Sequence, residues 1–301
     1  MNRLQRIAFI IVASATLAAC GSTASKPATA SGSVTPVDES VLALGVYEAA
    51  KANYEEWLAK LNAADGLALY SNDVYQNTLD DWAEAVDVYN GFSDNPAKAV
   101  EDYSIFSSDT YAERFDEKLN IMKVKYNKLL ALKERADTVL ADSIDQMAYL
   151  NEIDAESYFE SEFKGINRVY KTLFEYVADK DLADAQNKQA SFLNDAKKLE
   201  VKVVLHIHIA PLEAEVKLLN NQDVSLHAPI SYAKAKSELA LSKNAVQTNP
   251  RNNQVIKEAV SKVKFEIAHA THIASEVQRL KSTKNNKCPQ LGIPLLNPCR
   301  L

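Results

Sequence analysis

Two histidines and a glutamate near the end of the chain have a spacing that could support chemistry. His269, His272 and Glu276 lie three and four residues apart, so they share one face if residues 254–281 form a helix. Imidazole and carboxylate groups at this spacing can bind a metal ion or exchange a proton. They can equally be ordinary polar positions on a solvated or second packing face. A metal site made of these three residues is therefore one hypothesis, and a polar surface is the other.

The same helix contains a Glu-x-x-His segment, formed by Glu266 and His269. It resembles the segment of di-iron helical bundles, in which a second copy and two further glutamates complete the site. The sequence holds no second copy. His206 and His208 would share a face only on a strand, because on a helix they point about 200° apart.

Motifs of the common enzyme classes are missing from the sequence. It contains no G-x-x-x-x-G-K-[ST], G-x-G-x-x-G, G-x-S-x-G or H-E-x-x-H, which are the usual marks of nucleotide, dinucleotide, hydrolase and metalloprotease sites. We therefore expect no enzymatic activity and no bound cofactor.

The N-terminus predicts a secreted, lipid-anchored protein. Residues 1–19 place Arg3 and Arg6 before an uncharged, mostly apolar run that ends in small residues, which is the layout of a secretory signal peptide. The sequence "LAAC" at 17–20, followed by Gly21, resembles the lipobox of bacterial lipoproteins. That resemblance implies cleavage before Cys20, a diacylglycerol on its thiol and acylation of the new N-terminus. Gly21 in place of Asp implies delivery to the outer membrane.

Residues 20–37 predict a flexible tether. They contain Gly, Ser, Thr, Ala, Lys and Pro with almost no large apolar side chain, a composition that cannot bury enough surface to fold. Two or three acyl chains on Cys20 would hold the protein stably, because each buried methylene contributes roughly 0.8 kcal/mol.

The last segment, residues 282–301, holds the other two cysteines of the chain. Cys288 and Cys299 are separated by ten residues that include three prolines. In an oxidising periplasm such a pair is expected to close a small disulfide loop. A redox-active pair would have the closer C-x-x-C spacing. The loop carries several Leu and Ile residues, so it either docks on the body or is offered to a partner.

Residues 38–281 predict an all-α fold, an elongated bundle of long amphipathic helices with coiled-coil-like packing. Glycine and proline are scarce there, and Ala, Leu, Lys and Glu are abundant, which favours long helices. Apolar residues recur at alternating three- and four-residue spacing from 47 to 64 and from 115 to 150, the second as one helix of about 54 Å. The alternating segment 200–211 could be a strand, but it has no partner strand, so we expect a helix.

A C-terminal helical hairpin is expected from residues 229–281. Two apolar seams flank a joint at 247–253, and Pro229 and Pro250 each suit a first helical turn,. This Ala-rich region, preceded by "AP" at 228–229, loosely resembles helical, coiled-coil-like lipoproteins of Gram-negative envelopes. The resemblance covers about 80 residues and implies an envelope role.

Charge is distributed unevenly along the body, which suggests an acidic half at 38–178 and a basic half at 179–281. Residues 37–163 carry 10 Lys and Arg against 27 Asp and Glu, a net charge of −17, whereas residues 164–301 carry 21 against 13, a net of +8. Either the two halves fold against each other, or the basic half meets an anionic surface.

These features predict a non-enzymatic, periplasm-facing outer-membrane lipoprotein that acts as a structural or adaptor component. Its partner would be an envelope protein or an anionic cell-wall polymer, and not a nucleic acid. The alternative is a binding protein for a small ligand or metal, held in the bundle core or on the His269/His272 face. The seams can close within one chain or between chains, so the sequence leaves the oligomeric state open, and it does not exclude exposure at the cell surface.

Overall fold

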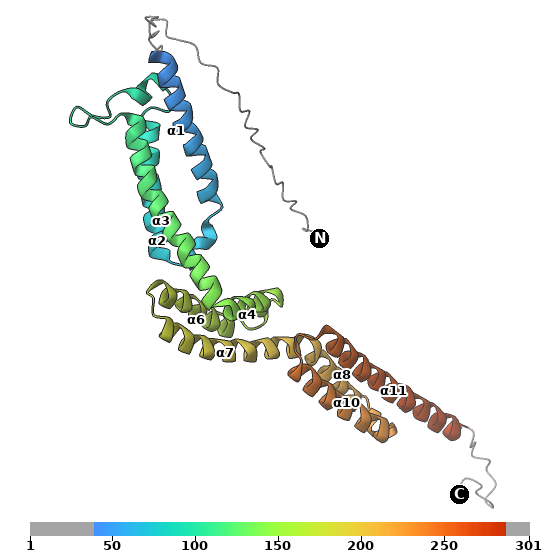
Figure 1. Ribbon diagram of the computed structural model, residues 1–301. Helices are drawn as coiled ribbons and strands as arrows, with labels where there is room; N and C mark the ends of the chain where they lie inside the picture. The colour runs from blue at the N-terminus through green and yellow to red at the C-terminus, as the bar shows by residue number, and fades with distance from the viewer. Residues whose placement is uncertain (1–38, 287–301) are drawn as a thin grey trace, which may run out of the picture.

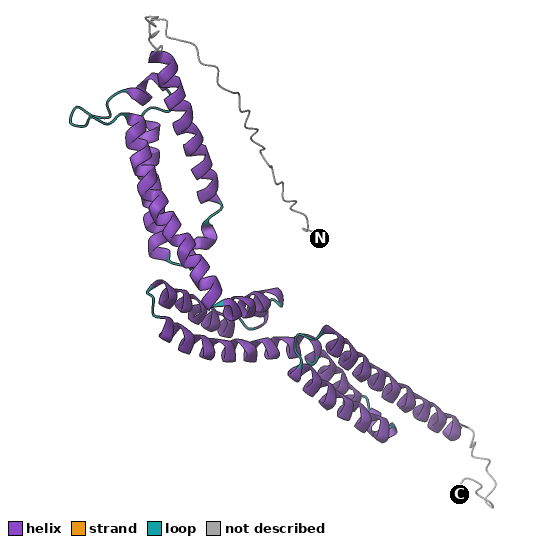
Figure 2. Ribbon diagram, viewed as in Figure 1, coloured by secondary structure: helices purple, strands orange, loops and turns teal. Residues whose placement is uncertain are grey.

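The computed structural model describes residues 39–286, and within that range it is all-α, as the sequence predicts (Figures 1 and 2). Eleven α-helices and two short 3-10 helices follow one another along an elongated, bent body, and the described residues contain no strand. None of these helices is long and apolar enough to cross a membrane. The lipobox, the tether and the two cysteines of the tail lie outside the described residues.

The N-terminal segment packs three helices around aromatic side chains. It consists of α1 (Glu39–Asn62), η1 (Asp65–Leu69), α2 (Asn72–Asn90), η2 (Pro96–Val100) and α3 (Tyr111–Val139). Trp57 and Leu61 of the predicted first seam are buried, as are Phe92 and Phe115. Tyr54 stacks on Tyr89 with ring centroids 4.3 Å apart. The first seam is therefore a packing face, as its spacing predicts.

The second seam is split between two segments of the molecule, so the prediction of one continuous helix over 115–150 is wrong. The chain leaves helical geometry at Leu140, which has φ −105° and ψ 17°, and α4 (Ala141–Glu152) turns into the middle segment. Leu140 is fully buried. Apolar spacing shows which residues face a core. It does not show the direction of the chain, so the spacing can continue through a bend when the helices before and after the bend are both packed against a core.

The middle segment contains α4, α5 (Ala155–Tyr158), α6 (Glu160–Ala178) and α7 (Leu182–His208). Helices α6 and α7 are separated by a short break at 179–181, with Lys180 in the left-handed region at φ 64°. The Asp181 N–H donates to the Tyr176 carbonyl and the Lys180 N–H to the Val177 carbonyl, which is a Schellman cap. Residues 200–208 are helical, as expected.

The C-terminal segment contains α8 (Ala210–Asn221), α9 (Val224–His227), α10 (Pro229–Thr248) and α11 (Asn253–Asn286). Helices α10 and α11 form the predicted hairpin (Figure 1), and Pro229 begins α10. Pro250 lies in the turn and not in the first turn of α11. The physical reason is Asn252, whose side-chain oxygen accepts the N–H groups of Gln254 and Val255 and so starts the helix,.

The middle and C-terminal segments repeat the same backbone plan at an offset of 69 residues. Ala141 and Ala210 begin α4 and α8, and Asp154 and Asp223 hold left-handed conformations at φ 54° and 59°. Helices α5 and α9, and then α6 and α10, begin at the same offset. Seven pairs of equivalent positions are buried in both segments: 143/212, 147/216, 150/219, 155/224, 166/235, 173/242 and 177/246.

The acidic and basic ends of the molecule lie apart. Helices α1–α3 occupy one end of the body and α8–α11 the other (Figure 1). Among the described residues, no ion pair joins 39–139 to 210–286. The two ends therefore form no ion pair with each other, whereas Lys202–Glu162 and Arg251–Asp145 join the basic half to the acidic half at the middle segment.

Candidate functional site

The predicted metal ligands lie on the exposed face of α11, opposite its packing seam. The His269 side chain is 43% exposed and its ring is parallel to Phe265, with centroids 6.1 Å apart. The Glu276 carboxylate pairs with Arg279, with 2.9 Å between Oε2 and Nη2. Hydrogen bonding to Arg279 lowers the pKa of Glu276, and His272 lowers it slightly further. Within residues 39–286, no three His, Cys, Asp or Glu side chains are grouped so that they could hold a metal.

Glu266, the first residue of the Glu-x-x-His segment, faces α10, whereas His269 and His272 face solvent. Its side chain is 8% exposed, and Oε1 lies 2.8 Å from Nζ of Lys234. Its Oε2 has no hydrogen-bond partner and lies 3.9 Å from Nδ1 of His269. Glu266 thus acts as a cross-hairpin ion-pair partner.

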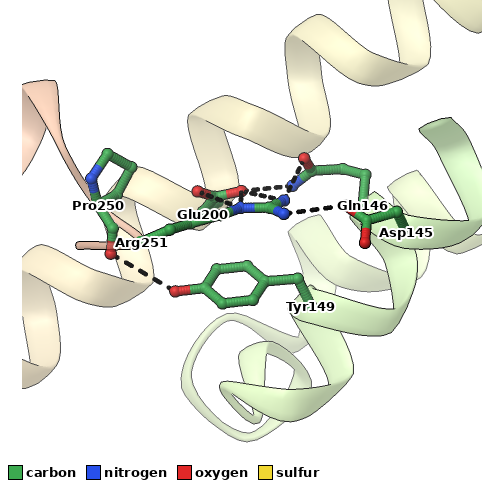
Figure 3. A network of polar contacts seen from close by, with 6 residues as sticks. All are labelled: Asp145, Gln146, Tyr149, Glu200, Pro250 and Arg251. Atoms are coloured by element: carbon green, nitrogen blue, oxygen red, sulfur yellow. Dashed lines mark hydrogen bonds and ion pairs between the residues drawn. The ribbon is translucent and has the colours of Figure 1, made fainter. Parts of the chain in front are cut away.

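A polar network joins the middle segment to the turn of the C-terminal hairpin, and Arg251 is its centre (Figure 3). The Arg251 Nε donates to both Glu200 oxygens at 3.1 and 3.2 Å, and Nη2 donates to Glu200 Oε2 at 2.9 Å. Nη2 also donates to Gln146 at 2.7 Å, and Nη1 to Asp145 at 2.9 Å. The Gln146 amide donates to Glu200 at 2.7 Å. One side chain in a turn therefore ties α4 to α7.

Tyr149 contacts both Arg251 and the backbone of the turn. Its ring lies 4.2 Å from the Arg251 guanidinium, and its hydroxyl donates to the Pro250 carbonyl at 3.5 Å. The hydrogen bond to Glu200 is the main cause that raises the pKa of Arg251. Burial raises the pKa of Tyr149, and the Glu200 charge raises it further. The arginine is therefore charged at every physiological pH and its donors are directed at protein acceptors.

The network forms the wall of an open cleft of about 1090 Å³ between α4, α7 and the 247–254 turn. Lys197 and Asp142 line its rim together with a group of amide side chains. Because the carboxylates of Asp145 and Glu200 already neutralise Arg251, the cleft has no free guanidinium to receive an anion. Its polar groups form a clamp, in which Arg251 of the turn between α10 and α11 binds to α4 and α7 and so links the C-terminal segment to the middle segment.

A smaller hollow of about 400 Å³ lies between α6 and α7. Its apolar floor contains Ile166, Val169 and Phe192. At its rim, Lys202 of α7 pairs with Glu162 of α6, and Lys198 pairs with Asp195 within α7 at 2.9 Å. The hollow therefore combines an apolar floor with a charged rim.

No protein-family model matches this chain, and neither does any curated protein or solved structure. Function must therefore be argued from the chain's own geometry.

The sequence pattern did not reveal the clamp. Arg251 is a single arginine in a Pro-Arg-Asn-Asn turn, and its partners lie 51 residues or more away in the chain. One signal was present: Glu200 interrupts an apolar stretch, and a buried carboxylate needs a cationic or amide partner.

Proposed function

We propose that this protein is a non-enzymatic lipoprotein of the bacterial envelope, attached to the outer membrane through Cys20 and facing the periplasm. Its helical body would act as a structural or adaptor component between that membrane and an envelope protein or an anionic envelope polymer. The observation that carries the proposal is the separation of charge along an elongated body, with the acidic end next to the expected anchor and the basic end remote from it.

The basic end carries exposed lysine side chains that could bind an anionic partner. Residues 210–286 carry 11 Lys and Arg against 7 Asp and Glu, a net charge of +4. Lys257, Lys262 and Lys264 on α11 are exposed and form no ion pair within the described part of the chain. An anionic partner could therefore bind there without first breaking an internal salt bridge.

The adaptor role is tested by cross-linking in cells. A photo-reactive residue at Lys257 or Lys264 should capture an envelope component, identified by mass spectrometry, and Lys262→Glu should reduce that capture. The matched control is the same residue at Lys128, an exposed lysine of α3, which should not capture it. Capture of nothing except further copies of this chain would count against the adaptor role.

The anchor is tested separately. Wild-type protein should incorporate palmitate and remain with the outer-membrane fraction, whereas Cys20→Ala should do neither. The alternative of a metal-binding protein is tested by titration with Zn²⁺. Binding that is lost in His269→Ala/His272→Ala would support it, and binding unchanged in that variant would end it.

A further inference from the structure

A loop projects from the end of the body at which α1 begins (Figure 1). Residues 101–110 form a short hairpin, here called the finger. Its base is an antiparallel bridge between Asp102 and Thr110, and its tip is a turn closed by the Ser107 N–H and the Ser104 carbonyl at 3.1 Å. The Tyr103 N–H donates to the Asp109 carbonyl at 2.8 Å. The finger therefore has a defined shape.

The tip carries two large apolar side chains where turns normally carry polar ones. Ile105 and Phe106 are the central residues of the turn, and each is 93% exposed. Gly, Pro, Asn, Asp and Ser dominate such positions, because their backbones or side chains suit the turn. Ile and Phe provide neither advantage, so the turn is not the reason for their presence.

The base of the finger is fixed to the helical body. Tyr103 and Tyr111 pack edge to face with centroids 5.1 Å apart, and the Arg114 guanidinium lies 5.8 Å from the Tyr103 ring. Thr110 caps α3 in a reciprocal capping box with Glu113. Because the base is held in this way, Ile105 and Phe106 cannot fold back onto the core without breaking these contacts.

The finger lies at the end of the body that the expected anchor reaches first. The adjacent helix η2 packs against α1. The first turns of α1 expose further apolar residues, Val41 and Leu42, by 62% and 56%. Eighteen residues lie between Cys20 and Glu39, and the chain from one to the other spans at most about 65 Å when extended and roughly 24 Å as a random coil. A lipid on Cys20 would thus keep the bilayer within reach of the finger at high effective concentration.

We propose that the finger inserts Ile105 and Phe106 into the phospholipid surface to which Cys20 is anchored, and so sets the orientation of the rod on the membrane. This inference rests on the lipid anchor of the proposed function. Burying each side chain in the interface should strengthen insertion roughly tenfold or more. Two such side chains bind weakly by themselves, and tethering makes the contact persistent.

Charge decides which lipid surface fits. Residues 39–110 carry 3 Lys and Arg against 14 Asp and Glu, a net charge of −11. An anionic surface would repel this segment at low salt. The occupant we infer is a zwitterionic phospholipid surface, entered through apolar contact alone.

The test uses full-length lipidated protein in phosphatidylethanolamine/phosphatidylcholine vesicles that contain brominated acyl chains, which quench nearby tryptophan. Phe106→Trp should add fluorescence that these lipids quench, above the constant background of Trp57 and Trp82. Ile230→Trp is the matched control, because Ile230 is 84% exposed on α10 in the C-terminal segment. Its added fluorescence should not be quenched. Vesicles rich in phosphatidylglycerol should give less quenching of Phe106→Trp at low salt, and added salt should restore it.

The anchor and the finger fail in different ways. If both variants incorporate palmitate and sediment with vesicles but Phe106→Trp is quenched no more than Ile230→Trp, the finger does not insert and the inference is overturned while the anchor stands. If the protein neither incorporates palmitate nor sediments, both the anchor and the inference fall. Capture of a single protein by a cross-linker at position 106, with no lipid quenching, would identify the finger as a protein-binding element and also overturn the inference.

Discussion

Replacing Arg251 with methionine should loosen the joint between the middle and C-terminal segments. The substitution removes three hydrogen bonds to Glu200, whose side chain is only 5% exposed. Removing one partner of a buried ion pair costs about 3–5 kcal/mol. The Arg251 side chain is 39% exposed, so water can solvate part of the abandoned carboxylate. We therefore expect a loss of about 2–3 kcal/mol in the free energy of unfolding of this part.

The assay is urea unfolding followed by circular dichroism, together with amide hydrogen exchange in α7 and α11. The matched control is Arg279→Met, on α11. Arg279 is 64% exposed and pairs with the exposed Glu276, so its loss should cost about 0.2–0.5 kcal/mol. Adding Glu200→Leu to Arg251→Met should recover most of the loss, because it removes the buried unpaired charge. If Arg251→Met costs no more than Arg279→Met, or if Glu200→Leu adds a further loss, the reasoning is refuted.

Four further substitutions test the backbone and the core. Lys180→Gly should raise the free energy of unfolding by about 1 kcal/mol, because Lys180 holds a left-handed conformation at φ 64°,; thermal unfolding checks this. Gly165→Ala should stabilise α6 by about 0.8–1 kcal/mol, since a Cβ there meets nothing within 4 Å, whereas Gly91→Ala should destabilise, because its Cβ would lie 2.9 Å from the Tyr111 ring,. Burial raises the pKa of Tyr170 to about 12; an unfolded tyrosine ionises near pH 10, so this group should lower the free energy of unfolding by up to about 3 kcal/mol between pH 10 and 12. Tyr170→Phe should reduce the loss of stability over that range in pH-dependent unfolding.

Local periodicity was enough to predict most of the helices. The seam of residues 47–64 faces the N-terminal core, and the seam of residues 115–150 begins in that core and ends in the core of the middle segment. The helical reading of 200–208 succeeded because Leu199 and Val203 continue the three-four spacing and both are buried. A repeating apolar face reports burial directly, because the helix must turn that face toward a core.

The bend at Leu140 and the clamp at Arg251 could not be predicted in the same way. Leu140 keeps the seam spacing and is fully buried, so the pattern contains no sign that the chain changes direction there. Arg251 has partners on two other helices, 51 to 106 residues away, and an isolated sequence gives no register for such distant pairs. The helical face of His269 and His272 was placed correctly, whereas their use as ligands with Glu276 stays a prediction.

The 69-residue repeat places side chains of different size at equivalent buried positions of the two related segments. Leu173 and Ile166 of the middle segment correspond to Ser242 and Ala235 in the hairpin. The smaller pair buries less apolar surface. The Ser242 hydroxyl donates a hydrogen bond to the Ala259 carbonyl at 3.1 Å. This bond links α10 to α11, although a single hydrogen bond contributes only about 0.5–1.5 kcal/mol to stability. Arg251 adds a tie that reaches beyond the hairpin, because it joins the turn between α10 and α11 to α4 and α7 of the middle segment.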